Sequence, residues 1–317
     1  MNNFAEERRQ LLESIAQMYY IEGMSQADIA AKVSMSRANI SKLLKTCVDE
    51  HIVEFKINST SSPRTSLELM LQEKYNLKKA IVAPSDSHGE LSKNNVGLYA
   101  AEYLISTIKS GMLIGVAWGT TLYYVINNLK PKNTIQADVI QMVGGISPKS
   151  ADTDGQNLAQ KMAETLNGKC NIMQLPMLVQ SKLLRDLLLE EPFVSKHFKL
   201  FNDIDIAVVG LGSNRAESSA VYKSGYITRE ETESILELGA IGNICGHNID
   251  INGNPCATNL SDKVISIELN QLKKIDTVIG VASGFEKTQA ALASLRGSYI
   301  DVLIVDENLA HSILNAE

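Results

Sequence analysis

The chain has 317 residues, 44% of them hydrophobic, which is enough to bury a sizeable core and to form two domains of unequal size. Its formal net charge of −6 disfavours nucleic-acid binding unless lysine and arginine are concentrated on one local surface. The four cysteines are scattered, which excludes a disulfide-rich secreted domain and a paired-cysteine metal or redox motif. The sequence has no signal-peptide core, and no apolar run is long enough to span a bilayer. Together these features predict a cytoplasmic location.

The N-terminal residues predict three short helices and a strand. Apolar residues recur at helical spacing until Gly23 ends the first run. Ser25 and Ser36 are suitable caps for the second and third helices, because a serine oxygen accepts a free amide at a helix start. The expected helices span 7–21, 26–32 and 36–48, and an alternating stretch at 52–57 predicts the strand of a small wing.

Residues 26–45, QADIAAKVSMSRANISKLLK, fit a helix-turn-helix. Ala30 is small where two helices would cross, and Ser34 takes the turn position that glycine commonly fills. There is no acidic residue between Asp28 and Asp49, so the acidity of the whole protein is absent from this segment. The expected core residues are Ile29, Val33, Ile40 and Leu43, and the basic residues are Lys32, Arg37, Lys42 and Lys45.

The third of these helices is the candidate DNA-reading element. The N-terminal part of such a helix enters the major groove, where Arg37 can read guanine and Asn39 can read adenine in a bidentate manner. The predicted contact residues are Ser36, Arg37, Ala38 and Asn39, with Ser41, Lys42 and Lys45 positioned on phosphates. The alternative is a three-helix protein-interaction module with a solvated basic face.

A polar stretch, NSTSSPRTS at 58–66, predicts an interdomain linker. The sequence thus predicts a DNA-binding domain at 1–57 and an effector and oligomerisation domain at 67–317.

In the larger domain, strand-like apolar runs alternate with helical patterns, which indicates an α/β fold with a mainly parallel sheet covered by helices. Several runs end in glycine-rich turns, and ligands of such sheets bind at the carboxyl ends of the strands. The strand-like runs begin at 79, 113, 138, 171, 205, 277 and 299, and the helical patterns lie near 91–109, 120–129, 154–167, 180–200 and 286–295, with a terminal helix.

Two of these turns are candidate anion sites. In GVAWGTTL, Gly119, Thr120 and Thr121 open a helix, whose free amides and positive dipole end suit a phosphate or carboxylate, although a Gly-Thr pair is also an ordinary cap. In VASGFEKTQA, Ser283 precedes Lys287, and a lysine in a first helical turn favours an anionic partner unless it is simply solvated.

Two further glycine pairs end strands and would let a ligand approach the backbone closely, or would merely make turns. They are Gly144–Gly145 and the run from Gly210 to Gly212.

Almost from end to end, the chain resembles the SorC/DeoR type of sugar-binding transcriptional regulators. The matching pieces are YYIEGMSQADIAAKVSMSRANISKLLK, GVAWGTTL, MVGG, AVVGLGS, SGYIT, GAIGNI, GVASGFEK and RGSYIDVLIVD, in this order. The resemblance implies a Rossmann-like effector domain akin to sugar-phosphate isomerases, assembled as a dimer or tetramer. It also implies that Gly119, Thr120, Thr121 and Lys287 hold the phosphate of a phosphorylated effector.

The resemblance also implies sugar contacts at less certain positions. Many relatives have Asp or Glu where this chain has Asn243, and the amide keeps hydrogen bonding but loses the charge, which weakens any transfer of effector identity. Asp154 and Gln156 fall where relatives supply polar ligand contacts. We expect His88 and His247 to be ordinary polar residues, and we expect neither a metal nor a cofactor.

The sequence therefore predicts a non-enzymatic regulator of a carbohydrate-utilisation operon that binds double-stranded operator DNA and a sugar or sugar phosphate. The rival is an isomerase-like enzyme for sugar phosphates with an appended DNA-binding head, but no paired acid-base motif supports it. A purely structural oligomer would leave the Gly-Thr and lysine turns unexplained.

Overall fold

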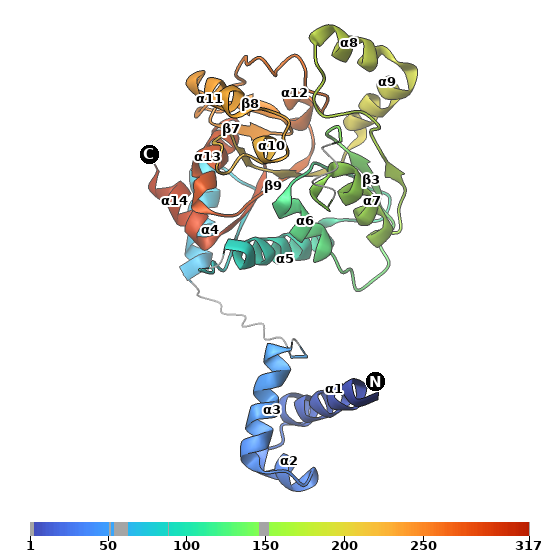
Figure 1. Ribbon diagram of the computed structural model, residues 1–317, viewed down its shortest axis with the longest axis vertical. Helices are drawn as coiled ribbons and strands as arrows, with labels where there is room; N and C mark the ends of the chain where they lie inside the picture. The colour runs from blue at the N-terminus through green and yellow to red at the C-terminus, as the bar shows by residue number, and fades with distance from the viewer. Residues whose placement is uncertain (1–2, 51, 54–62, 88, 146–151, 317) are drawn as a thin grey trace. The chain divides into compact units, whose positions relative to one another are not determined.

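The computed structural model describes residues 3–50, 52–53, 63–87, 89–145 and 152–316 (Figure 1). The chain forms two compact units, residues 1–60 and residues 61–317.

The described part of the small unit contains three α-helices. Helix α1 (Asn3–Ala16) continues into a π-helical turn (Gln17–Ile21), and α2 (Gln26–Lys32) and α3 (Arg37–Asp49) follow. The two predicted caps are present: the Ser25 hydroxyl accepts the Asp28 amide and the Ser36 hydroxyl accepts the Asn39 amide, each at 3.2 Å. These bonds satisfy amides that have no partner inside the helix.

The turn between α2 and α3 has a left-handed residue, because Ser34 adopts φ +54°. This conformation explains why glycine suits the position and why a serine there carries a small steric cost. The predicted core residues Ile29 and Ile40 are buried, whereas Val33 and Leu43 are partly buried and pack against the core. The buried residues of this cluster are Ile15, Met18, Ile29, Ala30, Ile40 and Leu44.

No strand forms in the part of the expected wing that the structure describes. Ile52 and Val53 form a bend that packs against a second cluster of α1 and α3 residues, and residues 54–57 lie outside the described residues.

The predicted linker is too long at its C-terminal end. Helix α4 (Pro63–Tyr75) begins within it, and residues 58–62 lie outside the described part. Leu67 and Leu71 of α4 are buried in the core of the large unit. Proline is favoured in the first turn of a helix, so a proline that reads as linker composition also fits a helix start.

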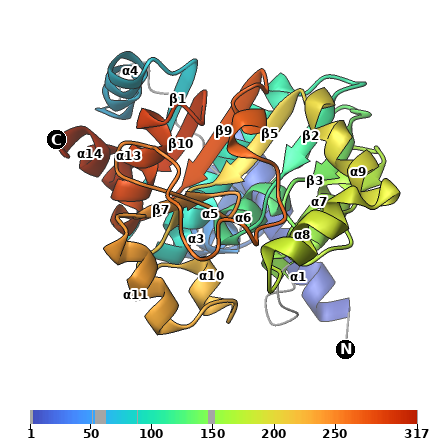
Figure 2. The same ribbon diagram turned by 90° about the horizontal axis from the view of Figure 1, so that it is seen from above.

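The large unit is built on a seven-stranded sheet in the order β1-β10-β9-β5-β2-β3-β4, and all its strand pairs are parallel (Figure 2). The α/β fold class is therefore confirmed. Strand β10 is buried throughout, as a parallel sheet covered on both faces requires. The strands are β1 (Lys79–Ala83), β2 (Leu113–Val116), β3 (Asp138–Gln141), β4 (Cys170–Asn171), β5 (Ile206–Gly210), β9 (Thr277–Ala282) and β10 (Val302–Asp306).

Helices cover the sheet where the sequence patterns predicted them. Helix α5 packs on β1, β9 and β10, α6 packs on β5 and β9, and α7 packs on β2 and β3. Their bounds are Gly89–Thr107 for α5, Thr120–Asn127 for α6, Gly155–Thr165 for α7, Lys182–Glu190 for α8, Pro192–Lys199 for α9, Leu269–Leu272 for α12, Thr288–Arg296 for α13 and Glu307–Asn315 for α14.

Between β5 and β9 the chain inserts a small antiparallel sheet that the sequence patterns did not predict. Its order is β6-β7-β8, with β6 (Gly212–Ser213), β7 (Gly242–Ile244) and β8 (His247–Ile249). Helices α10 (Ala220–Lys223) and α11 (Arg229–Glu237) belong to the same insertion. Within the described residues no helix combines the length and hydrophobicity needed to cross a lipid bilayer.

Candidate functional site

Strand order places a crevice between β2 and β5. Strands β3 and β4 lie on one side of β2, and the chain then returns to add β5, β9 and β10 on its other side. Ligands of open α/β sheets bind outside the carboxyl ends of the strands at such a reversal of order. A cavity of about 230 Å³ lies there and is lined by the turns after β2, β5 and β9 and by the inserted segment.

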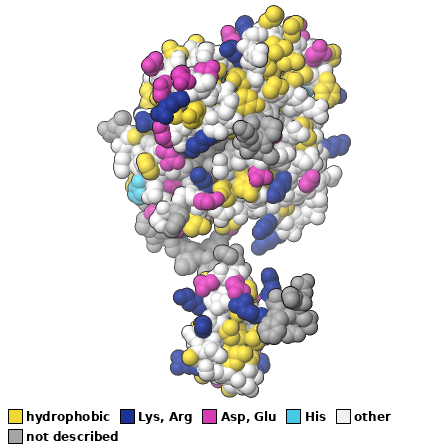
Figure 3. Space-filling model, viewed as in Figure 1, with side chains coloured by type: hydrophobic (Ala, Val, Ile, Leu, Met, Phe, Trp, Pro, Cys, Tyr) yellow, Lys and Arg dark blue, Asp and Glu magenta, His cyan; other side chains and the backbone are white. Residues whose placement is uncertain are grey.

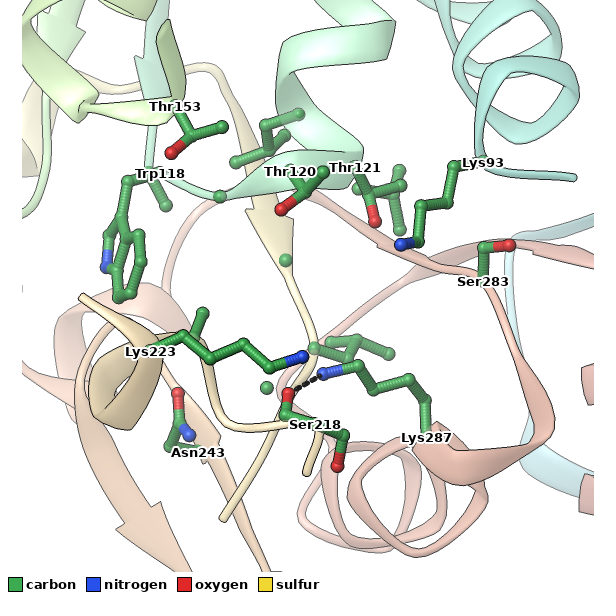
Figure 4. Close-up of a pocket in the computed structure, with 18 of the residues that line it drawn as sticks. Lys93, Trp118, Thr120, Thr121, Thr153, Ser218, Lys223, Asn243, Ser283 and Lys287 are labelled. Carbon is green, nitrogen blue, oxygen red and sulfur yellow. Dashed lines mark hydrogen bonds between the residues drawn. The ribbon is translucent and has the colours of Figure 1, made fainter. Parts of the chain in front are cut away.

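The turn after β2 forms one wall of this cavity. Gly119 precedes α6 with φ +126° and ψ 167°, a conformation that is essentially restricted to glycine. Thr120 and Thr121 follow it, and Figure 4 shows both hydroxyl oxygens directed into the cavity. The first amides of α6 and these hydroxyls therefore lie together at the positive end of a helix dipole.

Lysines from three separate elements reach the same cavity. Lys93 comes from α5, Lys223 from α10 and Lys287 from the turn before α13. Figure 4 shows the ammonium groups of Lys223 and Lys287 beside one another, and the Lys287 ammonium donates to the Ser218 carbonyl at 2.9 Å. Two acids, Glu217 and Glu286, also line the cavity. Because the lysines outnumber the acids by three to two, the formal charge of the wall is positive.

The protein environment disfavours the charge on Lys287. Desolvation lowers its pKa to about 8, and Lys223 and Lys93 lower it as well, while Glu286 opposes the shift. An anion placed among the three ammonium groups would favour the protonated form and would raise this pKa.

Ser283 lies at the end of β9 in the cavity wall and is buried. In the described part of the chain its hydroxyl has no hydrogen-bond partner. Figure 4 shows the oxygen turned away from Lys93. A buried hydroxyl without a partner carries a free-energy cost that a bound polar group can remove.

Asn243 reaches the cavity because Gly212 leaves room for it. A Cβ on Gly212 would lie 2.4 Å from the Asn243 amide oxygen. The Asn243 amide nitrogen donates to Asn214, and Asn214 in turn donates to Asn248 at 2.8 Å. The side chain is therefore held by a buried amide network, and Figure 4 shows its oxygen nearer to the cavity than its nitrogen.

The cavity brings together seven of the predicted effector residues: Gly119, Thr120, Thr121, Gly212, Asn243, Ser283 and Lys287. Their contact with a ligand remains a prediction.

The other four are absent from the described cavity wall. Gly144 and Gly145 pair with the chain around Pro176, where a Cβ on Gly144 would lie 2.6 Å from backbone atoms. Asp154 caps α7 by accepting the Gln156 amide at 3.0 Å, and the Gln156 side chain is exposed.

Sequence reasoning missed several residues of the wall. Trp118 carried a signal, because it directly precedes Gly119 in the quoted turn, and Lys223 directly precedes the SGYIT motif. Lys93, Thr153 and Ser218 carried none, since only the tertiary fold brings α5, the residue before the α7 cap and the inserted segment to this edge of the sheet.

A thiol also lines the cavity but is unsuited to nucleophilic chemistry. Burial raises the pKa of Cys245 to about 12, so the thiol stays protonated. Among the described residues, no group of three or more His, Cys, Asp or Glu side chains is placed to hold a metal ion.

The candidate DNA-reading residues lie together on the small unit. Ser36, Arg37, Ala38, Asn39, Ser41, Lys42 and Lys45 are all exposed, from the cap of α3 to its third turn. Two acids near this helix have partners of their own: Asp28 accepts the Ser25 hydroxyl at 2.6 Å and Glu50 pairs with Arg8 at 2.8 Å. Asp49 lies at the far end of α3, away from its first turns. The exposed surface of the first α3 turns is therefore basic and polar.

The family described as "Putative sugar-binding domain" matches residues 61–315. A sorbitol operon regulator from Klebsiella pneumoniae is 32% identical over 311 residues, covering 96% of this chain and 97% of the relative. The chain belongs to this family of sugar-binding transcriptional regulators. Its resemblance to SorC/DeoR-type proteins, inferred from the motifs, is thereby confirmed.

A further relative and a solved structure extend the likeness over both units. The deoxyribonucleoside regulator of Bacillus subtilis (strain 168) is 29% identical over 311 residues, 98% of each protein. The crystal structure of the full-length sorbitol operon regulator SorC from Klebsiella pneumoniae matches with a TM-score of 0.83 and 30% identity, covering 96% of this chain and 98% of that chain. These relatives are named as regulators and not as enzymes, as the sequence predicted.

A substitution at Gly119 tests the strained turn. Gly119→Ala is expected to lower the free energy of unfolding by about 1–3 kcal/mol, because alanine rarely adopts this backbone conformation. A Cβ there meets no atom within 4 Å, so strain alone would act. Gly89→Ala is the control, since Gly89 has equal space and no positive φ. Equal unfolding free energies for the two variants in urea titrations would contradict the interpretation.

Proposed function

We propose that this protein is a cytoplasmic regulator that binds operator DNA through α3 and is controlled by a sugar or sugar phosphate in the cavity of the large unit. The observation that carries the proposal is the cavity at the β2–β5 crevice, where three lysines and the start of α6 converge. This arrangement suits a phosphate bound to a small polyhydroxylated molecule. The exposed polar and basic residues of α3 supply the DNA-binding surface.

The relatives support a carbohydrate-utilisation operon as the target, since one is named for a sorbitol operon and another for deoxyribonucleosides. We infer that the heads bind as pairs in a homodimer or tetramer. A two-fold pair favours a palindromic operator with half-sites near whole helical turns apart. Effector binding then changes the orientation or spacing of the paired heads and so changes operator affinity.

The deciding experiment combines DNA protection with ligand screening. The purified protein is tested for salt-sensitive footprints on promoter fragments near its own gene, with and without sugars and sugar phosphates that raise its melting temperature. A footprint whose affinity changes with one such ligand supports the proposal. No footprint under any of these conditions, or turnover of a sugar phosphate by the protein, would overturn it.

The cavity chemistry predicts a pH window for a phosphorylated effector. The pKa of Lys287 is about 8, so its side chain is charged below that pH. The charge is lost as the pH rises through 8. A phosphate monoester loses its second proton near pH 6. Affinity is therefore expected to be greatest between about pH 6 and pH 8 and to fall above pH 8, with proton uptake on binding. Calorimetry in buffers of different ionisation enthalpy measures both effects, and a flat profile from pH 7 to 9.5 would contradict the role of Lys287.

A further inference from the structure

Three buried asparagines of the inserted sheet lie in a row behind the cavity wall. Asn243 belongs to β7, Asn248 belongs to β8 and Asn214 directly follows β6. Their exposed fractions are 8%, 7% and 6%, in this order. Asn243 lines the cavity, whereas Asn214 lies outside the described cavity wall. Any effect of Asn214 on a ligand in the cavity therefore passes through Asn243.

Backbone carbonyls fix the direction in which the Asn214 amide faces. The nitrogen and oxygen of a side-chain amide have nearly the same size, so their hydrogen-bond partners decide the orientation. The Asn214 nitrogen donates to the Ala240 carbonyl at 2.9 Å and to the Gly242 carbonyl at 3.2 Å. Because carbonyl oxygens only accept, this end of the amide has to be the nitrogen. The Asn214 oxygen then faces Asn243.

The Asn243 amide is oriented in turn by Asn214. Its nitrogen donates to the Asn214 oxygen at 2.7 Å, and Figure 4 shows its own oxygen nearer to the cavity. In the described part of the chain this oxygen accepts no hydrogen bond. Turning the amide over would break the bond to Asn214 and would set two oxygens against each other behind the wall. Asn243 therefore presents an acceptor to the cavity, without the negative charge of a carboxylate.

An acceptor at this position distinguishes between kinds of sugar. A free hydroxyl can donate to the Asn243 oxygen, whereas a deoxy position, an ether or a fluorine cannot and would leave this oxygen without a partner. An ammonium group would also donate, but the lysines of the cavity wall repel it. The outer surface makes no such distinction, since Figure 3 shows basic and acidic side chains side by side over the large unit.

We propose that Asn214 is a positioning residue of the effector site: it holds Asn243 as a hydrogen-bond acceptor and so selects an effector with a free hydroxyl at that point. The inference rests on the proposed function, because it concerns the sugar part of the same effector. Figure 4 shows Asn243 across the cavity from Thr120 and Thr121, so the selected hydroxyl lies on the far side of the effector from its phosphate.

The first test exchanges single hydroxyls for fluorine in the probe and uses the wild-type protein. Ribose 5-phosphate, glucose 6-phosphate and sorbitol 6-phosphate are titrated by calorimetry, and the tightest binder is compared with its deoxyfluoro derivatives. Fluorine is similar in size to a hydroxyl but cannot donate, so at one position the exchange is expected to weaken binding at least about tenfold. A bound probe that tolerates fluorine at every position overturns the role of Asn214 alone. Failure of every sugar and sugar phosphate to bind overturns the proposed function and this inference together.

Two variants of Asn214 assign the fluorine penalty to this residue. Asn214→Leu removes the oxygen that holds Asn243, so the penalty at the sensitive position is expected to fall below about threefold. Asn214→Asp is the matched control, because it keeps an oxygen toward Asn243 and loses, as leucine does, the bonds that the amide nitrogen donates. The aspartate variant is expected to keep the penalty. Equal penalties in the two variants would overturn the proposal.

Inorganic phosphate separates a local effect from a general loss of structure. It can bind at the start of α6 without reaching Asn243, so its affinity should be the same in the wild type and in both variants. A leucine variant that loses phosphate and sugar phosphate affinity by the same factor would give Asn214 a merely structural role and would overturn the proposal.

Gly212→Ala provides the same test if a variant of Asn214 does not fold. Its Cβ would lie 2.4 Å from the Asn243 oxygen and would displace that amide without changing Asn214. The fluorine penalty is expected to disappear in this variant as well. A penalty equal to that of the wild type would overturn the proposal.

Discussion

Replacing Arg37 by alanine is expected to weaken specific operator binding about 5- to 150-fold while leaving effector affinity unchanged. Arg37 is the first residue of α3 and is exposed. A bidentate arginine–guanine contact contributes about 1–3 kcal/mol of discrimination, which gives this range. The loss should be confined to the cognate site, so that affinity for unrelated DNA changes far less. Fluorescence anisotropy with specific and scrambled duplexes measures both affinities.

Two further variants separate base reading from simple charge. Arg9→Ala removes an exposed arginine of the same unit that pairs with Glu13 on α1, and it should leave specificity intact. Lys42→Ala should weaken binding to all sequences alike and reduce the salt dependence by about one phosphate contact. If Arg37→Ala lowered effector affinity by the same factor as operator affinity, the two units would not act as separate modules.

Replacing Lys287 by methionine is expected to weaken binding of a phosphorylated effector about 10- to 150-fold. A hydrogen bond to a charged group contributes about 1.5–3 kcal/mol, and methionine keeps the length of the side chain without its charge. Binding of an unphosphorylated sugar at the same cavity should change little, because the remaining wall is unaltered. Isothermal titration with each ligand pair measures the difference.

The same variant, which weakens ligand binding, is not expected to weaken the stability of the fold. Burial and the neighbouring lysines lower the pKa of Lys287 from 10.5 to about 8, so at neutral pH its charge opposes folding. Removing that charge should leave the melting temperature unchanged or raise it. Lys274→Met is the control, since Lys274 is exposed and outside the described cavity wall. Equal affinity of wild type and Lys287→Met for the phosphorylated ligand would remove Lys287 from the site.

The parallel sheet could be predicted because its signals are local. Buried parallel strands read as continuous apolar runs, and the runs that end at Gly119 and Ser283 were found in this way. The helix caps were equally local, since Ser25 and Ser36 each accept a hydrogen bond from the amide three residues ahead.

The inserted sheet could not be predicted from such patterns. Strands β6, β7 and β8 have two or three residues each, which is too short for an alternation to be recognised. The site was therefore predicted only in part. Lys93 comes from α5 and Lys223 from the insertion. Only the packed fold brings both to the start of α6 at Thr120. Lysines that meet only in the folded protein have no characteristic spacing in the sequence, so the sequence does not reveal that they share a site.

Trp118 is the single tryptophan of the chain and stands in the wall of the cavity. Its ultraviolet emission therefore reports on one place in the molecule, without a label and without a background from other indoles. Because energetic coupling between two ligands is reciprocal, an operator that alters effector affinity must favour a different state of the effector unit. A change in the native fluorescence on adding operator DNA alone would therefore report how the cavity wall of the large unit responds to DNA binding at the small unit.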